Sequence, residues 1–409
     1  MKHHIILITS FSLALLSCSR DKDTIPDPPT TNPSTSPVET NAPNTNYSPA
    51  FAGQTRVSGV TTSARYRATV VTTSLTSPWG ITGLPDGRLL VTEKTGRMRI
   101  VTVSGNLSQP ITGIPSVNSS GQGGLLGLCL DPGFATNRMV YWSFSEPATG
   151  GNLTAIAKGR LTDNESIIEG ATVIYRAEPA YAGNNHYGGR VVFDRTGNLL
   201  VSTGERSDAG IRSQAQSINS GLGKIIRITR DGQPSSGNPF VAQQGARPEL
   251  YSIGHRNPQG LAIHPVTGDL WQSEHGPRGG DELNRVQAGT NYGWPIITYG
   301  IEYSGQPVGS AVQQSAGMEQ PVYYWDPVVS PSGMTFYSSD RIAEWRNNLF
   351  IGSLSGMHIV RLVIENNRVV GEERLLANER QRFRDIAQGT DGALYAITDG
   401  GRLYRIDRE

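Results

Sequence analysis

The sequence predicts an all-β fold, a six-bladed β-propeller built from four-stranded antiparallel blades. Short apolar runs rich in β-branched residues recur in pairs, a turn-forming segment separates the two runs of each pair, and helical periodicity is nowhere sustained. The 409 residues include 48 glycines and 25 prolines, a composition typical of many short strands joined by turns. A closed barrel or a sandwich is the alternative fold, but irregular spacing and long loops favour blades.

Six predicted hairpins follow one another along the chain, and each leaves room for two more strands. They span residues 79–92, 125–144, 191–203, 260–273, 334–353 and 385–398. Unusual polar residues stand just before the first strand or just after the second strand of these hairpins. If the blades surround one axis, these ends converge on the mouth of one face. We therefore expect a shared ligand site there.

The third hairpin supplies a candidate catalytic pair. Its turn, residues 194–198, separates two apolar runs, so folding the chain there brings His186 beside Glu205. A carboxylate that hydrogen-bonds one imidazole nitrogen fixes the tautomer and raises the basicity of the other nitrogen. The pair is therefore a candidate general base. A structural His–Glu pair at a strand end is the alternative on these residues alone.

The N-terminus, residues 1–18, is predicted to be a lipoprotein signal peptide. A basic start precedes a short apolar run, and the LLSC segment that ends at Cys18 resembles a bacterial lipobox, in which the cysteine carries the lipid. An ordinary secretory signal with a chance cysteine is the alternative. The pattern indicates an extracytoplasmic protein, periplasmic or of the cell envelope, held to the membrane only by a lipid at Cys18.

Residues 19–50 are rich in Pro, Thr, Ser and Asn with scarcely an apolar side chain, so we expect a disordered tether. Residues 51–409 are expected to form the propeller domain. The formal net charge of +1, without a patch dense in Lys and Arg, argues against nucleic acid as a partner. Cys129 lies in an apolar run and is predicted to be a small core residue.

Five motifs lie on these hairpins or at their ends. They are GQGGLLGL at 121–128, NHYGGR at 185–190, GHRNPQGLA at 254–262, SEHGPRGGDELN and GTNYGWP between 273 and 295, and RFRDI at 382–386. In these motifs the chain resembles the soluble aldose (glucose/sorbosone-type) dehydrogenases that use pyrroloquinoline quinone (PQQ), over most of residues 77–409. The resemblance implies a quinoprotein oxidoreductase that oxidises the anomeric C1 hydroxyl of aldose sugars to lactones by hydride transfer to calcium-bound PQQ.

The resemblance also implies roles for single residues. His186 would accept the proton of the anomeric hydroxyl, and Glu205 would orient that histidine. The three carboxylates of PQQ suit planar guanidinium groups, which pair with carboxylates bidentately. The positions that match contacts to PQQ are Gln122, His186, Arg256, Asn257, Arg382 and Arg384.

Calcium is the metal that the resemblance implies. Gly276 and Pro277 match two backbone carbonyls that hold the active-site ion, and oxygen-only ligation suits a hard cation such as Ca²⁺. Its role would be Lewis-acid polarisation of the quinone carbonyl. Glu282 and Tyr292 resemble a second, structural calcium site, to which Tyr292 would contribute its backbone oxygen. His275 lacks partners at ligand spacing and is not assigned to a metal.

The chain departs from the glucose-dehydrogenase branch at two positions. Ser355 stands where that branch has a lysine that contacts the cofactor, and Asn185 stands where it has an aspartate. An external electron acceptor is the other implied partner, and a monomer or homodimer is expected. The alternative functions are a calcium-dependent propeller lactonase or hydrolase, which needs acidic metal ligands, and a non-catalytic carbohydrate-binding propeller.

Overall fold

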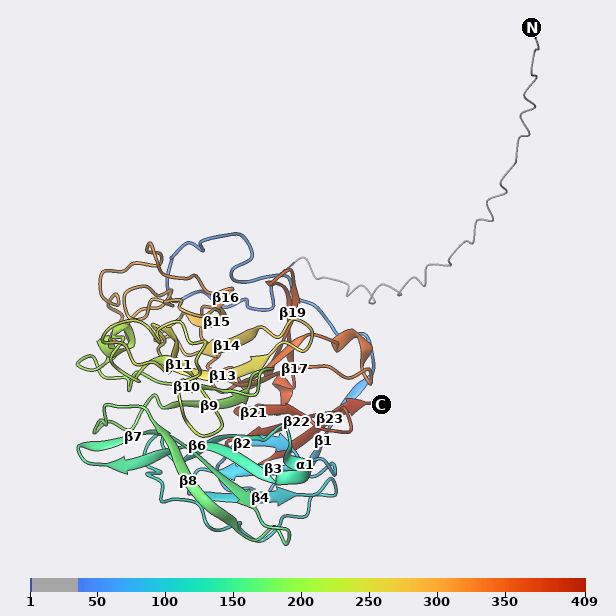
Figure 1. Ribbon diagram of the computed structural model, residues 1–409. Helices are drawn as coiled ribbons and strands as arrows, with labels where there is room; N and C mark the ends of the chain where they lie inside the picture. The colour runs from blue at the N-terminus through green and yellow to red at the C-terminus, as the bar shows by residue number, and fades with distance from the viewer. Residues whose placement is uncertain (2–35) are drawn as a thin grey trace. The chain divides into compact units, whose positions relative to one another are not determined.

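The structure, a computed structural model, describes Met1 and residues 36–409. The predicted lipobox with Cys18 and the first part of the predicted tether lie outside the described residues. Residues 36–409 form six antiparallel sheets with only short helical turns between them (Figure 1). In this part of the chain no helix has the length and apolar character needed to cross a membrane.

The first three sheets come from the N-terminal half of the propeller. The first contains β2 (Pro78–Gly83), β3 (Leu89–Glu93) and β4 (Arg97–Val101). The second contains β5 (Leu125–Leu130), β6 (Met139–Ala148), β7 (Gly151–Leu161) and β8 (Ile168–Arg176). The third contains β9 (Gly188–Phe193), β10 (Leu199–Thr203), β11 (Lys224–Ile228) and β12 (Leu250–Ile253).

The remaining sheets follow in the same way, except that the last takes its outer strand from the start of the domain. The fourth contains β13 (Pro258–Ile263), β14 (Leu270–Glu274), β15 (Asp281–Val286) and β16 (Tyr323–Trp325). The fifth contains β17 (Pro331–Phe336), β18 (Leu349–Ser353), β19 (Ile359–Glu365) and β20 (Arg368–Leu375). The sixth contains β21 (Phe383–Gln388), β22 (Leu394–Thr398), β23 (Leu403–Arg408) and β1 (Tyr66–Thr72). Short helical elements are α1 (Phe134–Asn137), η1 (Arg212–Gln216), η2 (Ala343–Trp345) and η3 (Ala377–Glu379).

In five of the sheets the strand that comes first in the chain lies innermost. In the sixth sheet β21 lies innermost, and β1, which comes earlier in the chain, lies outermost. β2 contacts β5, β5 contacts β9, β9 contacts β13, β13 contacts β17, β17 contacts β21, and β21 contacts β2 again. The inner strands therefore form a closed ring, and the prediction of a six-bladed propeller is confirmed. Strand β1 completes the last blade by pairing antiparallel with β23, with Tyr66 opposite Arg408.

The first blade differs from the predicted four strands, because its sheet has only β2, β3 and β4. The fourth position is taken by a segment that touches β4 through isolated bridges, Val101 with Leu107 and Met98 with Ile111. Pro110 lies inside that segment, and a proline cannot donate a ladder hydrogen bond. Pro110 therefore supplies no donor to this edge, and only isolated bridges join the segment to β4.

The hydrophobic core is divided into layers between neighbouring blades rather than gathered at one centre. Buried clusters join the first blade to the second, the second to the third, and so on around the ring to the sixth and first. Cys129 packs at the edge of the layer between the second and third blades, as a partly buried residue beside Tyr141. Each blade therefore depends on both neighbours for the burial of its apolar faces.

Each inner strand is irregular where it begins. The pairing of every inner strand with the second strand of its blade contains a register shift near the start of the inner strand. Bulges of this kind turn side chains away from the regular alternation and are common beside active sites. In the second, third, fourth and sixth blades the irregular end is the one that carries the polar residues marked in the sequence.

The described part of the predicted tether packs on the propeller, contrary to the expectation of disorder for that part. Asp326 accepts hydrogen bonds from the backbone N–H groups of Asn44 and Thr45, at 2.9 and 3.0 Å. Glu39 pairs with Arg374 at 2.8 Å. The composition predicted no packing because the segment is nearly free of apolar residues, but its polar groups find fixed partners on the fourth and fifth blades.

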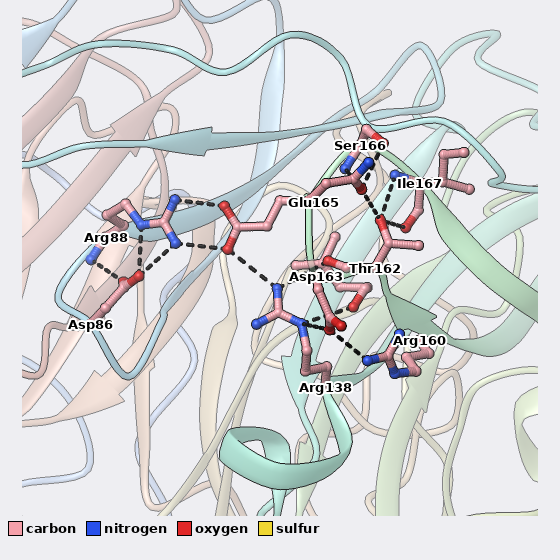
Figure 2. A network of polar contacts seen from close by, with 11 residues as sticks. Asp86, Arg88, Arg138, Arg160, Thr162, Asp163, Glu165, Ser166 and Ile167 are labelled. Atoms are coloured by element: carbon pink, nitrogen blue, oxygen red, sulfur yellow. Dashed lines mark hydrogen bonds and ion pairs between the residues drawn. The ribbon is translucent and has the colours of Figure 1, made fainter.

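An electrostatic network joins the first and second blades through the turns that follow β2 and β7 (Figure 2). Arg88, in the turn after β2, holds Glu165, in the turn after β7, through two hydrogen bonds of 2.6 and 2.7 Å. Arg138 also pairs with Glu165, at 3.2 Å. These contacts lie beside the incomplete edge of the first blade and tie it to its neighbour.

Candidate functional site

The candidate catalytic pair meets at the start of the third blade. His186 stands two residues before β9 and Glu205 two residues after β10, and the hairpin folds them together as the sequence predicts. The Nδ1 atom of His186 lies 3.0 and 3.1 Å from the two carboxylate oxygens of Glu205. Both side chains are buried, and the backbone of His186 adopts a left-handed conformation with φ of 46°.

The surroundings favour a neutral imidazole beside an ionised carboxylate. Burial lowers the pKa of His186, the charge of Arg256 lowers it further, and Glu205 opposes both effects. Burial alone would raise the pKa of Glu205, but His186, Arg256 and the N–H of Ser207 outweigh it and hold that pKa below its usual value. We assign Nδ1 as the protonated nitrogen because it faces the carboxylate. Nε2 is then the basic nitrogen.

A cavity of about 300 Å³ lies at the converging ends of the inner strands. Its polar lining includes Lys94, Gln122, Gln259, His275, Arg382 and Arg384. The pair stands directly behind this lining, because the side-chain oxygen of Gln122 accepts a hydrogen bond of 2.9 Å from the backbone N–H of His186.

One wall of the cavity carries an excess of positive charge. Arg382 and Arg384 share a single carboxylate, Asp399, at 2.9 and 2.7 Å. Lys94 faces them, and burial followed by repulsion from Arg384 lowers its pKa. The ammonium of Lys94 is held by the carbonyl of Gly121 at 2.7 Å. Two arginines and a lysine are thus set against one carboxylate, which suits an anionic ligand with several carboxylates.

The predicted residues Arg256 and Asn257 also lie behind the lining. Arg256 donates to the carbonyls of His275 and Gly276, at 3.1 and 2.6 Å, and its guanidinium lies over the ring of Trp294. The side-chain oxygen of Asn257 accepts from the N–H of Gly188 at 3.1 Å. The Nδ2 group of Asn257 and the Nε of Arg256 are buried without a hydrogen-bond partner in the described structure. Such donors carry a desolvation cost unless a ligand or water accepts from them.

Hydrogen bonds to Asp281 hold in place the loop that is predicted to carry the active-site metal. Gly276 donates its N–H to Asp281 at 2.8 Å, and the other oxygen of Asp281 accepts from the N–H groups of Val329 and Ser330 at 2.8 and 2.6 Å. The carbonyl of Gly276 already accepts from Arg256, and Pro277 is buried. Within residues 36–409, no set of three His, Cys, Asp or Glu side chains is placed to hold a metal ion, so the candidate ligands are backbone oxygens.

The two residues of the second predicted metal site, Glu282 and Tyr292, do not contact each other through a side-chain hydrogen bond or ion pair in the described residues. Burial and repulsion from Glu274 and Asp281 raise the pKa of Glu282 well above its usual value. The ring of Tyr292 stacks on His255, with ring centroids 4.8 Å apart. No hydrogen bond or ion pair between side chains joins Glu282 to Tyr292 in the described residues, so the pairing of these positions rests on the resemblance.

The structure also places the two positions that differ from the glucose-dehydrogenase branch, Ser355 and Asn185, and two cavity residues that the sequence did not predict. Ser355 lies beside the cavity, with its hydroxyl 2.7 Å from that of Ser330 in the lining. The carbonyl of Asn185 accepts from Arg206 at 3.0 Å. Lys94 was missed, although it directly follows β3 at the end of a hairpin where polar residues gather. Trp79 in the lining was missed because an aromatic residue inside a strand looks like core.

Comparison with known proteins agrees with this geometry. The model of the Glucose / Sorbosone dehydrogenase family matches residues 75–405. The aldose sugar dehydrogenase YliI of Escherichia coli is 41% identical over 342 residues, which cover 82% of this chain and 91% of that protein.

Two solved structures show the same fold. The soluble aldose sugar dehydrogenase from Escherichia coli, in its apo-form, gives a TM-score of 0.81 at 39% identity over 84% of this chain and 100% of that one. The PQQ-bound aldose sugar dehydrogenase from Streptomyces coelicolor gives 0.70 at 30% identity over 85% of this chain and 100% of that one. With its ring of blades, its converging polar ends and these matches, the chain belongs to the Glucose / Sorbosone dehydrogenase family.

Proposed function

We propose that this protein is a PQQ-dependent dehydrogenase that oxidises the C1 hydroxyl of aldose sugars to lactones and passes the electrons to an external acceptor. The observation that carries the proposal is the buried His186–Glu205 pair directly behind a cavity with a cationic wall. The PQQ-bound relative from Streptomyces coelicolor supports the choice of cofactor.

The residues of the cavity fit PQQ. Its carboxylates would be held by Arg382, Arg384 and Lys94, whose charges exceed that of Asp399. The unpartnered Nδ2 of Asn257 offers a further donor, and Gln122 lines the same space. When bound, PQQ would supply a quinone that accepts a hydride.

The protein's own part in the reaction is proton transfer and orientation. Nε2 of His186 would take the proton from the sugar's C1 hydroxyl, because Nδ1 is engaged by Glu205. The negative charge of Glu205 would stabilise the imidazolium that forms, in a site where burial strengthens the attraction. Loss of the hydride from C1 to the bound quinone and loss of the C1 hydroxyl proton to Nε2 of His186 would together give the lactone, and the proton would stay on His186 until solvent removes it.

Calcium fits the loop of Gly276 and Pro277, where backbone oxygens are the candidate donors. When bound, the ion would act as a Lewis acid. At the second proposed site, a cation bound by Glu282 and the backbone oxygen of Tyr292 would offset the repulsion among Glu282, Glu274 and Asp281. Oxygen ligation at both places favours Ca²⁺ over a transition metal.

We further propose that the protein is extracytoplasmic and anchored by a lipid at Cys18, which lies outside the described residues. A propeller lactonase or hydrolase is disfavoured because the lining of the main cavity contains no aspartate or glutamate in the described residues. A non-catalytic carbohydrate-binding propeller is disfavoured because the His186–Glu205 pair stands beside a cavity with a cationic wall.

The test uses the full-length protein purified in detergent and depleted of cofactor and metal. PQQ and Ca²⁺ together should restore dye reduction with a panel of aldoses and yield lactone, whereas PQQ with a chelator, or NAD or FAD with Ca²⁺, should not. Activity without PQQ would contradict the choice of cofactor. Full activity in rigorously metal-free protein would remove calcium from the mechanism.

A further inference from the structure

Arg190 lies at the centre of the ring, under the cavity. It belongs to the inner strand β9 and is buried, with 6% of the residue exposed. Its guanidinium reaches three other blades. Nη1 pairs with Asp385 of β21 at 2.6 Å, Nε donates to the carbonyl of Gln259 of β13 at 2.6 Å, and the group lies over the ring of Trp79 of β2, 4.2 Å from its centroid.

The remaining inner strands also close on this ion pair. In β17, a Cβ added at Gly333 would lie 1.7 Å from Oδ1 of Asp385 and 2.5 Å from Nη2 of Arg190, so only glycine fits there. In β5, a Cβ added at Gly127 would lie 3.3 Å from the Cα of Arg190. All six inner strands of the described ring therefore meet at Arg190 and Asp385.

The same contacts reach the lining of the cavity. Nη2 of Arg190 donates to the carbonyl of Arg384 at 3.1 Å, and Arg384 belongs to the cationic wall. Gln259, whose carbonyl Arg190 holds, donates through its side chain to Asn257 at 3.3 Å. Trp79 lines the cavity and stacks on the guanidinium. The side chain of Arg190 thus contacts three residues that line the cavity, Arg384, Gln259 and Trp79, which together are called the cavity floor here.

Stability alone does not explain such a pair. Burial lowers the pKa of Arg190 and raises the pKa of Asp385, because loss of hydration disfavours the charged form of each group. Replacing a buried ion pair by apolar residues of similar volume is often neutral or stabilising. What apolar residues cannot reproduce is the fork of N–H donors, which reaches Asp385, Gln259 and Arg384 at fixed angles.

We propose that Arg190 is a positioning residue that, with Asp385, joins the inner strands beneath the cavity and sets the positions of Arg384, Asn257 and Trp79 for the cofactor. The proposal rests on the proposed function, since the ligand it prepares for is PQQ. Arg190 does not touch the reacting atoms, so its effect is expected in cofactor affinity and in the environment of Trp79 rather than in the chemical step.

The first experiment titrates the full-length apo-protein with PQQ in the presence of Ca²⁺ and follows the fluorescence. Arg190→Lys keeps the charge but loses the fork, so PQQ affinity should fall about tenfold, equivalent to one misplaced contact. The matched control is Arg361→Lys, which changes another buried arginine, paired with Glu373 at 2.7 Å and outside the lining. The control should lose stability without losing PQQ affinity.

A second variant separates positioning from folding. Arg190→Met combined with Asp385→Leu removes both charges of the buried pair, so the variant should retain most of its thermal stability yet bind PQQ at least tenfold more weakly. Wild-type affinity in both Arg190→Lys and the double variant would overturn the proposal. Failure of both to fold would overturn it too, because the pair would then be a requirement of the ring itself.

A third measurement keeps the two proposals distinguishable. In apo-protein, acrylamide quenching of Trp79, taken as the difference from a Trp79→Phe background, should increase in Arg190→Lys as the floor opens. If wild-type protein does not bind PQQ, the proposed function fails, and this quenching alone decides whether Arg190 shapes the cavity. Unchanged quenching would then refute the role assigned to Arg190.

Discussion

His186 and Glu205 form a two-oxygen contact in which one imidazole nitrogen faces both oxygens of a fully buried carboxylate, at 3.0 and 3.1 Å. This arrangement holds the ring and leaves the opposite nitrogen as the base. It also places the charge that stabilises the protonated ring inside the protein, where water cannot screen it.

Replacing His186 by alanine should lower kcat by about 10² to 10⁴, the usual effect of removing a positioned general base. PQQ binding should stay largely intact, because Arg382 and Arg384 hold the cationic wall without the histidine. Steady-state kinetics beside a PQQ titration measure both effects. Near wild-type turnover would return His186 to a structural role.

Glu205→Gln should cost less than His186→Ala and should move the pH dependence. The carboxylate raises the pKa of His186 against burial and Arg256, so its loss should lower that pKa further. The acidic limb of the kcat profile should therefore shift to lower pH while the plateau falls. The double variant should be little worse than His186→Ala, because the two residues act as one unit. Additive losses would contradict a shared role.

Lys94→Met should weaken PQQ binding by about tenfold to a hundredfold, the worth of one hydrogen bond to a charged group. Lys94→Arg should retain most of the affinity because it keeps the charge. Ser355→Lys, introduced into Lys94→Met, should restore part of it, since Ser355 adjoins the cavity through Ser330. An unchanged dissociation constant in Lys94→Met would show that Lys94 does not contact the cofactor.

Glu165→Gln should destabilise the protein at neutral pH by about 1 kcal/mol, in the range of a well-formed surface pair. The side-chain hydrogen bond from Arg88 is the largest cause that lowers the pKa of Glu165 in the folded state. A depressed folded pKa contributes stability above the unfolded pKa of about 4.3, and that contribution is lost as the pH falls through the folded value. Urea unfolding of both proteins should therefore converge in acid. A difference that is the same at all pH values would exclude the ion pair as its source.

Deleting residues 1–47 should destabilise the propeller relative to deleting residues 1–35. The longer deletion removes the bonds of Asn44 and Thr45 to Asp326 and the pair of Glu39 with Arg374. A loss of about 1 to 3 kcal/mol is expected, because Asp326 and Arg374 lose partners. Chemical unfolding of the two truncated proteins makes the comparison. Equal stability would show that these contacts do not matter in solution.

The sequence was informative wherever the structure is local. The hairpins and the meeting of His186 with Glu205 depend on turns and short-range pairing. The structure places most hairpin ends within two residues of the prediction, although β9 and β17 begin three residues earlier and β6 ends four residues later. The bridged edge of the first blade was missed because the effect of Pro110 is clear only beside β4. The packing of residues 36–50 was missed for a related reason, since the partners of Asn44 and Glu39 lie 282 and 335 residues away along the chain.

Arg190 shows the same limit within a recognised motif. It closes NHYGGR, yet its contacts come from blades that begin far away in sequence, so the pattern alone gives it no role. Lys94 could have been predicted from the sequence, because it stands at a hairpin end like the other polar residues of the site.

The pairing of β1 with β23 makes the sixth blade depend on the last strand of the chain for its completion. β23 spans Leu403–Arg408, and Figure 1 shows it beside β1 near the C-terminus. During synthesis, β1 and β22 keep unpaired edges until this strand emerges, and such edges invite aggregation. The inner strands β21 and β2 can already meet at that stage, so the ring of blades closes before its last sheet is complete. The sixth blade is therefore the place where an incomplete chain would expose edges that can pair with other molecules.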